Sequence, residues 1–222
     1  MSAQRRLDRD RVGFITFFFL YYGAIAINVV FLPILLQNKG LTPLEIGGFL
    51  AAAPLVTLAV QPLWGMLADQ WGRLHVLVTL AMAGMLLAMG VLLNVQDSTL
   101  LFVSFLLYTA CSCPVIPLTD VRTLNYCEKK GIGYGTFRLW GSIGFAAMSV
   151  LFGFFAVGAG AGLLFGLFAA AIGLAAASQW LISPVRAAAP LKRGAYWLGM
   201  LTVLRDTRVW SFAVFLLLVG IP

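Results

Sequence analysis

Long apolar stretches separated by short polar turns run along most of this chain. Charged residues are almost absent from 12–36, 46–68, 76–93, 98–119, 139–185 and 209–222. Because a helix needs about 20 apolar residues to cross a bilayer, the pattern predicts spans over 13–36, 44–68, 75–94, 99–121, 134–157 and 161–183. The fold class predicted is therefore an all-α, polytopic membrane protein.

The polar stretches divide the chain into four regions. A basic amino-terminal region, 1–12, precedes a six-helix bundle, 13–183. A linker, 184–208, then leads to the start of a seventh helix, 209–222. That last stretch gives about 20 Å of helix against a hydrocarbon core of about 30 Å. We therefore expect a truncated seventh helix and a piece of a longer protein, whose carboxyl-terminal half would be a partner of this bundle.

The basic residues lie almost entirely on one side of the predicted topology. With the amino terminus inside, thirteen fall on the cytoplasmic side: Arg5, Arg6, Arg9, Arg11, Arg73, Arg122, Lys129, Lys130, Arg186, Lys192, Arg193, Arg205 and Arg208. The opposite side holds Lys39. This asymmetry follows the positive-inside rule. It predicts a multi-pass protein of the cell (inner) membrane with a cytoplasmic amino terminus, and it explains the net charge of +7 without a nucleic-acid partner.

Proline and glycine shape the predicted spans. Prolines fall inside the second and fourth spans, at Pro54, Pro62, Pro114 and Pro117. Because each removes a backbone donor, we expect the fourth span to bend just before Asp120. Small residues in the fifth span indicate close approach to a neighbouring helix: Gly135, Gly141, Gly144 and Ser149.

Two ionisable residues stand at the edges of apolar spans. Asp120 closes the fourth span and Arg138 opens the fifth, 18 positions later. In an antiparallel hairpin that turns near residue 130, both lie at comparable heights on facing helices. A charge pair beside a bent helix would form a polar site without an isolated buried charge. The alternative is that both side chains reach to the cytoplasmic interface.

Three further side chains are candidates for the same solute site. Ser142 and Phe145 follow Arg138 on one stripe of the predicted fifth span, and Asn28 is a carboxamide near the middle of the first. An arginine, a hydroxyl and an aromatic ring together could recognise a solute with a polar and an apolar end. Asn28 could equally serve as a hydrogen-bonding residue between helices.

The turn between the second and third spans carries the spacing Gly65-x-Leu-Ala-Asp69-x-x-Gly72-Arg73. The simple interpretation is a well-capped turn, with Asp69 accepting backbone donors at the start of the third span and glycine permitting the reversal. The spacing also resembles the cytoplasmic signature of the major facilitator superfamily. That resemblance implies a gating role for Gly65, Asp69, Gly72 and Arg73, weakened because Gln70 and Leu74 stand where basic residues are usual.

The segments Pro117–Asp120 and Tyr134–Ser142, with Gly40–Pro43 after the first span, resemble the phenylpropionate permease group of that superfamily. An acid, an arginine and an aromatic residue at the spacing of Asp120, Arg138 and Phe145 are also similar to the sugar-binding residues of lactose permease. The resemblance implies a proton-coupled symporter that works by alternating access. It favours an aromatic acid such as 3-phenylpropionate, with a sugar or nucleoside as the alternative.

Other function classes are less well supported. His75 lacks the partners of a hydrolase site, and the cysteines lack metal-ligand spacing, so we expect neither an enzyme nor a metal or organic cofactor. The driving force would be a proton gradient. A non-transporting sensor or half-transporter, or a pore made of two such halves, remains an alternative.

Overall fold

The computed structural model describes residues 3–155, 161–183 and 211. The chain divides into two compact units, 1–187 and 188–222, and the helices described below belong to the first. They are α1 (Ala3–Asn38), α2 (Pro43–Trp71), α3 (Leu74–Asn94), α4 (Ser98–Ser112), α5 (Val115–Lys130), α6 (Gly135–Phe155) and α7 (Ala161–Ser178). The predicted linker and seventh helix lie outside the described residues, apart from Ser211.

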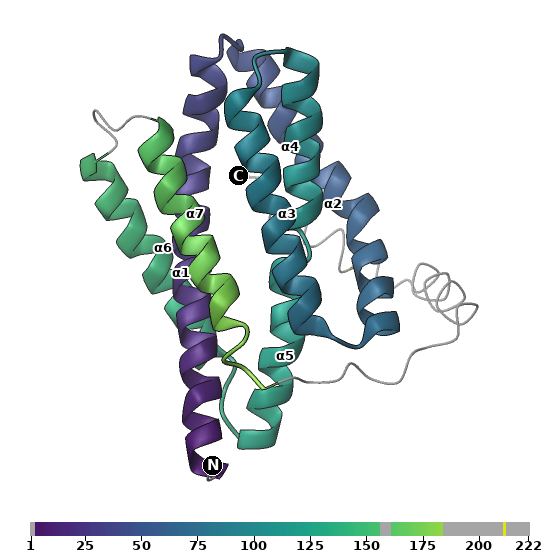
Figure 1. Ribbon diagram of the computed structural model, residues 1–222, viewed down its shortest axis with the longest axis vertical. Helices are drawn as coiled ribbons and strands as arrows, with labels where there is room; N and C mark the ends of the chain where they lie inside the picture. The colour runs from purple at the N-terminus through teal and green to yellow at the C-terminus, as the bar shows by residue number, and fades with distance from the viewer. Residues whose placement is uncertain (1–2, 156–160, 184–210, 212–222) are drawn as a thin grey trace. The chain divides into compact units, whose positions relative to one another are not determined.

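Each of the six predicted spans contains helix, which confirms the all-α bundle (Figure 1). Four helical stretches in the described part of the chain are long and apolar enough to cross a membrane: Arg9–Asn38, Pro43–Trp71, Leu74–Asn94 and Ser98–Lys130. The apolar helix Gly162–Ser178 is shorter. Short polar turns join α1 to α2, α2 to α3 and α3 to α4, so these helices run antiparallel.

The fourth span consists of two helices that meet at a proline, in the region where a bend is predicted. α4 ends at Ser112 and α5 begins at Val115, with Pro114 at the junction. Pro117 falls in the first turn of α5, where a missing backbone donor leaves no intrahelical bond unmade. The second span behaves differently, because Pro54 and Pro62 lie within the single helix α2.

The sequence predicts a connection over 122–133, between the fourth and fifth spans. A loop is the wrong prediction for most of this stretch, because it is helical. α5 continues to Lys130, and Gly131 then ends it in the left-handed conformation with φ 65°. Lys129 and Lys130 lie in the last turn of α5, where cations interact favourably with the helix dipole. Polarity therefore marked the end of the apolar span but not the end of the helix.

Packing places α1 beside α6 and α7, and α3 beside α4 and α5 (Figure 1). The close approach predicted for the fifth span is confirmed at two glycines. A Cβ on Gly144 would come within 2.8 Å of the Phe19 backbone, and one on Gly141 within 2.7 Å of the Tyr22 ring. It is wrong for Gly135, where a Cβ would meet no atom within 4 Å. The contact between α1 and α6 thus depends on the middle of the glycine stripe.

Candidate functional site

Asp120 is half-buried on α5, and its carboxylate accepts a hydrogen bond from a tyrosine. The Tyr134 hydroxyl donates to Oδ1 of Asp120 at 2.9 Å. Tyr134 lies in the turn before α6, so this bond ties that turn to α5. A neutral phenol donates one hydrogen bond, and Tyr134 directs it to the Asp120 carboxylate.

Arg138 lies on the first turns of α6, and its guanidinium stacks on an aromatic ring of α1. Its Cζ lies 4.1 Å from the centroid of the Tyr22 ring. An arginine over a tyrosine face is attracted by the ring quadrupole. Gly141 lies beside the stack, because a Cβ there would approach the Tyr22 ring at 2.7 Å and Nη1 of Arg138 at 3.0 Å. A residue with a side chain at 141 would disturb this contact.

The predicted charge pair takes an indirect form. Asp120 and Arg138 interact electrostatically, but no ion pair joins them within the described residues. Aromatic side chains connect them instead. Phe18 stacks with Tyr22 at a centroid separation of 6.2 Å and meets Tyr134 edge-on at 6.4 Å. We call Asp120, Tyr134, Phe18, Tyr22 and Arg138 the polar–aromatic cluster.

The remaining predicted solute-site residues lie outside the contacts of this cluster. Ser142 and Phe145 are exposed on α6, Phe145 at 39%. Asn28 is half-buried on α1, six residues after Tyr22 and so about 9 Å further along the helix. Its Nδ2 atom is buried without a hydrogen-bond partner. An unpaired buried amide of this kind costs free energy. The binding role of Asn28 stays a prediction.

One part of the prediction for the turn between α2 and α3 is confirmed, and another part is wrong. Gly72 takes the left-handed conformation, with φ 62°, and its N–H bonds the Ala68 carbonyl at 3.0 Å. Asp69, however, does not cap α3. The N-cap residue is Arg73, and it makes no side-chain cap hydrogen bond. Asp69 lies within the last turn of α2, because that helix runs on to Trp71.

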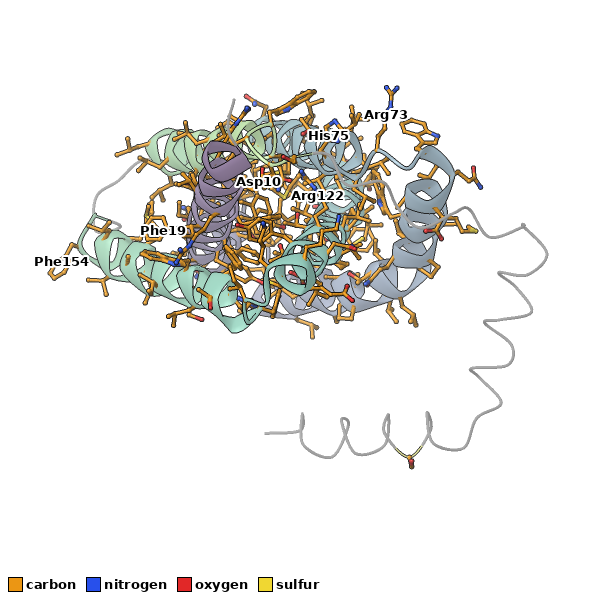
Figure 2. The ribbon with its side chains drawn as sticks, turned by 90° about the horizontal axis from the view of Figure 1, so that it is seen from below. Asp10, Phe19, Arg73, His75, Arg122 and Phe154 are labelled. Carbon is orange, nitrogen blue, oxygen red and sulfur yellow. The ribbon has the colours of Figure 1, made fainter. Side chains whose placement is uncertain are left out.

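The other members of the turn leave their predicted gating role open. Gly65 lies within α2 and is half-buried. Arg73 is exposed, and Figure 2 shows it at the edge of the molecule, further out than His75. Neither position shows a contact that distinguishes a gating residue from an ordinary turn residue, so the gating role stays a prediction.

A buried polar network between α5 and the residues that follow α7 was missed by the sequence analysis. Arg122, predicted to lie in a loop, is fully buried on α5. Its guanidinium donates to the Gln179 side chain, and to the backbone carbonyls of Gln179 and Ile182 at 3.3 Å each. The Nε2 atom of Gln179 also donates to Thr119 at 3.4 Å. Carbonyls beyond the end of α7 thus accept hydrogen bonds from the terminal nitrogens of a buried cation, whose Nε has no partner among the described residues.

A second contact anchors the same end of the bundle. Asp10 on α1 is buried near Arg122 (Figure 2), and the two charges interact. The Asp10 carboxylate accepts hydrogen bonds from the backbone N–H of Ser183 at 2.8 Å and from its hydroxyl at 3.0 Å. The sequence offers little signal for either contact, because the partners are separated by more than fifty residues and none belongs to a motif.

Comparison with known proteins gives this geometry a context. A family model described as the MFS_1 like family, within the major facilitator superfamily, matches residues 14–222. The chain belongs to this family. The predicted superfamily is confirmed, and this MFS_1-like chain is the amino-terminal bundle of a multi-pass membrane transporter fold.

Three curated relatives are transporters by name. The maltose permease of Geobacillus stearothermophilus is 37% identical over 137 residues, 61% of this chain and 34% of the relative. An uncharacterized transporter of Bacillus subtilis (strain 168) is 31% identical over 143 residues, 60% of this chain and 33% of the relative. A probable 3-phenylpropionic acid transporter of Escherichia coli (strain K12) is 30% identical over 146 residues, 64% of this chain and 36% of the relative.

The MFS_1-like chain spans about a third of the length of these curated relatives. No solved structure matches it. The family assignment therefore rests on the sequence match over residues 14–222, and the geometry of the site rests on the described helices.

Proposed function

We propose that this bundle belongs to a secondary active transporter that moves a small organic solute by proton-coupled symport. The solute would bind between this bundle and a second one, and alternating access would be driven by a proton gradient without a cofactor. The positive-inside pattern supports an orientation in the cell (inner) membrane with the amino terminus in the cytoplasm. Transport rather than catalysis is supported by the family and by the names of its relatives.

The observation that carries the proposal is the polar–aromatic cluster. It places a half-buried carboxylate and a guanidinium near each other between α1, α5 and α6. Such groups are expensive inside a membrane protein and usually mark a solute or ion pathway. Arg138 would bind the anionic end of the solute through paired N–H donors, and Asp120 would hold the polar side of the site. Ser142, Phe145 and Asn28 are proposed to contact the rest of the solute.

An aromatic acid such as 3-phenylpropionate is the preferred solute. A carboxylate matches the forked donors of arginine, and the ring of Phe145 suits an aromatic body. A sugar is the second candidate, and the 37% identity with a maltose permease favours it. A nucleoside is a further alternative for the solute. The alternative to transport is a sensor that binds a solute without moving it.

Uptake of labelled 3-phenylpropionate and maltose into proteoliposomes, with and without an inward proton gradient, tests the proposal. Gradient-dependent uptake of the acid, accompanied by alkalinisation of the outer medium, is the expected result. Uptake of maltose alone would select the second candidate. Saturable binding with no flux of either compound would select the sensor.

Substitution at Arg138 tests its proposed role in the same assay. Arg138→Lys keeps the charge but loses the planar fork, so carboxylate uptake should fall by about tenfold or more at low solute concentration, which corresponds to about 1.4 kcal/mol. Arg11→Lys is the matched control, because Arg11 is an exposed arginine at the cytoplasmic end of α1. Undiminished uptake by Arg138→Lys would remove the clamp from the proposal.

A further inference from the structure

The partner of the Arg138 guanidinium is an aromatic ring and not a carboxylate. Its Cζ lies 4.1 Å from the Tyr22 centroid, while the carboxylate of Asp120 is engaged by the Tyr134 hydroxyl at 2.9 Å. Among the described residues, no hydrogen bond or ion pair occupies an N–H of Arg138. The ring lies against Cζ and accepts no conventional hydrogen bond from the five N–H donors of the guanidinium. Those donors remain available.

The fold fixes the plane of this stack from several sides. Tyr22 is stacked on Phe18, with 12° between the rings, and meets Tyr21 edge-on at 87°. On the other side, Gly141 leaves room for the ring and the guanidinium together, since a Cβ there would lie 2.7 Å from the one and 3.0 Å from the other. Rings of α1 thus pack against Tyr22, and Gly141 of α6 leaves the space that the Tyr22 ring occupies.

Tyr134, and not Arg138, bonds the Asp120 carboxylate. Its hydroxyl donates to Oδ1 at 2.9 Å, and among the described residues no ion pair joins that carboxylate to Arg138. Phe18 packs against both Tyr22 and Tyr134, so one ring links the aromatic partner of Arg138 to the hydrogen-bond partner of Asp120. An arginine paired with Asp120 would offer fewer free donors to a solute.

We propose that Tyr22 determines specificity in the proposed solute site, by holding Arg138 stacked and apart from Asp120 so that its N–H donors face a planar carboxylate. This inference rests on the proposed function and narrows its solute class to carboxylates. A guanidinium already held in one plane loses less side-chain freedom when a solute binds. An uncharged sugar cannot use the charge-assisted, paired hydrogen bonds that such an arginine offers.

Two substitutions at Tyr22 separate the ring from the hydroxyl. Tyr22→Phe keeps an aromatic face and should leave the KM for 3-phenylpropionate within about twofold of the original. Tyr22→Leu removes that face and should raise KM about tenfold, which corresponds to about 1.4 kcal/mol, with the maximal rate little changed, because Arg138 is no longer held in place before the solute binds. Phe19→Leu is the matched control, since Phe19 is a neighbouring aromatic residue of α1 outside the cluster. Equal KM values for Tyr22→Phe and Tyr22→Leu would overturn the role of the ring.

A thermal-unfolding cycle tests the contact without any solute. Tyr22→Leu, Arg138→Met and the double variant are melted in detergent as purified full-length protein. If the stack exists, the double variant should lose less in Tm than the sum of the single losses. Strictly additive losses overturn the contact between Tyr22 and Arg138. Absence of carboxylate uptake by the unaltered protein overturns the proposed function and the specificity role, even where the cycle supports the stack.

Discussion

Replacing Gly144 with alanine should weaken the contact between α1 and α6 more than the same change at Gly135 or Gly141. The added Cβ would lie 2.8 Å from both the Cα and the carbonyl carbon of Phe19, and closest to its carbonyl oxygen. Carbon atoms pack at about 3.5–4.0 Å, so the helices must separate by about 1 Å. Backbone atoms cannot rotate away as a side chain can.

The expected magnitude follows from two opposing effects. Overpacking costs about 1–3 kcal/mol, and a backbone obstacle places Gly144 near the upper end. Alanine in place of glycine returns about 1 kcal/mol of helix propensity. The net destabilisation is therefore about 2 kcal/mol, or about 4–8 °C in Tm for a chain of this size.

Heating the detergent-purified protein and measuring the folded fraction by size-exclusion chromatography gives this Tm. Gly135→Ala is the matched control, because a Cβ at that position of α6 meets no atom within 4 Å. Gly135→Ala should melt at or above the temperature of the original protein. A difference in Tm of less than 1 °C between Gly144→Ala and Gly135→Ala would refute the predicted clash, because a difference of roughly 6 °C is expected.

Two further substitutions test the ends of the bundle by the same melting assay. Gln179→Leu removes a hydrogen-bond acceptor from the buried Arg122 and should lower the free energy of unfolding by about 2 kcal/mol. Gln96→Leu, at an exposed turn, is the control and should change it little. Equal Tm values for the two variants would refute the buried network. Lys39→Met removes the ammonium that donates to two carbonyls at the end of α3, and should cost about 1 kcal/mol. Lys129→Met, on the exposed last turn of α5, is its control, and a similar loss there would argue against a capping role for Lys39.

The placement of Arg122 has a physical consequence for Asp120. Pro114 lies at the junction of α4 and α5 and contributes no backbone donor to the hydrogen-bond ladder there. Thr119 and Arg122 bind Gln179, beyond the end of α7. Asp120 lies on another side of the helix, 100° from Thr119, and meets Tyr134. The buried network and the cluster therefore hold the same short helix from two sides.

The sequence by itself determined the helical class, the approximate places of the helices, and the disturbance at the prolines of the fourth span. Each of these depends on local chemistry: the length of apolar runs against the thickness of a bilayer, and the missing donor of proline. The candidate pair Asp120 and Arg138 also came from the sequence, because ionisable residues at the edges of apolar spans are rare. The position of Gly72 at a left-handed turn was predicted for the same local reason.

Only the tertiary structure decided which groups these residues meet. Asp120 binds Tyr134 and Arg138 stacks on Tyr22, where the sequence predicted a direct pair, because helix rotation sets the partners of a side chain and is not written in an apolar pattern. Arg122 is a hydrophilic residue near a basic stretch, and its burial depends on carbonyls beyond the end of α7, at Gln179 and Ile182. Contacts between residues far apart in the chain exist only once the helices have packed.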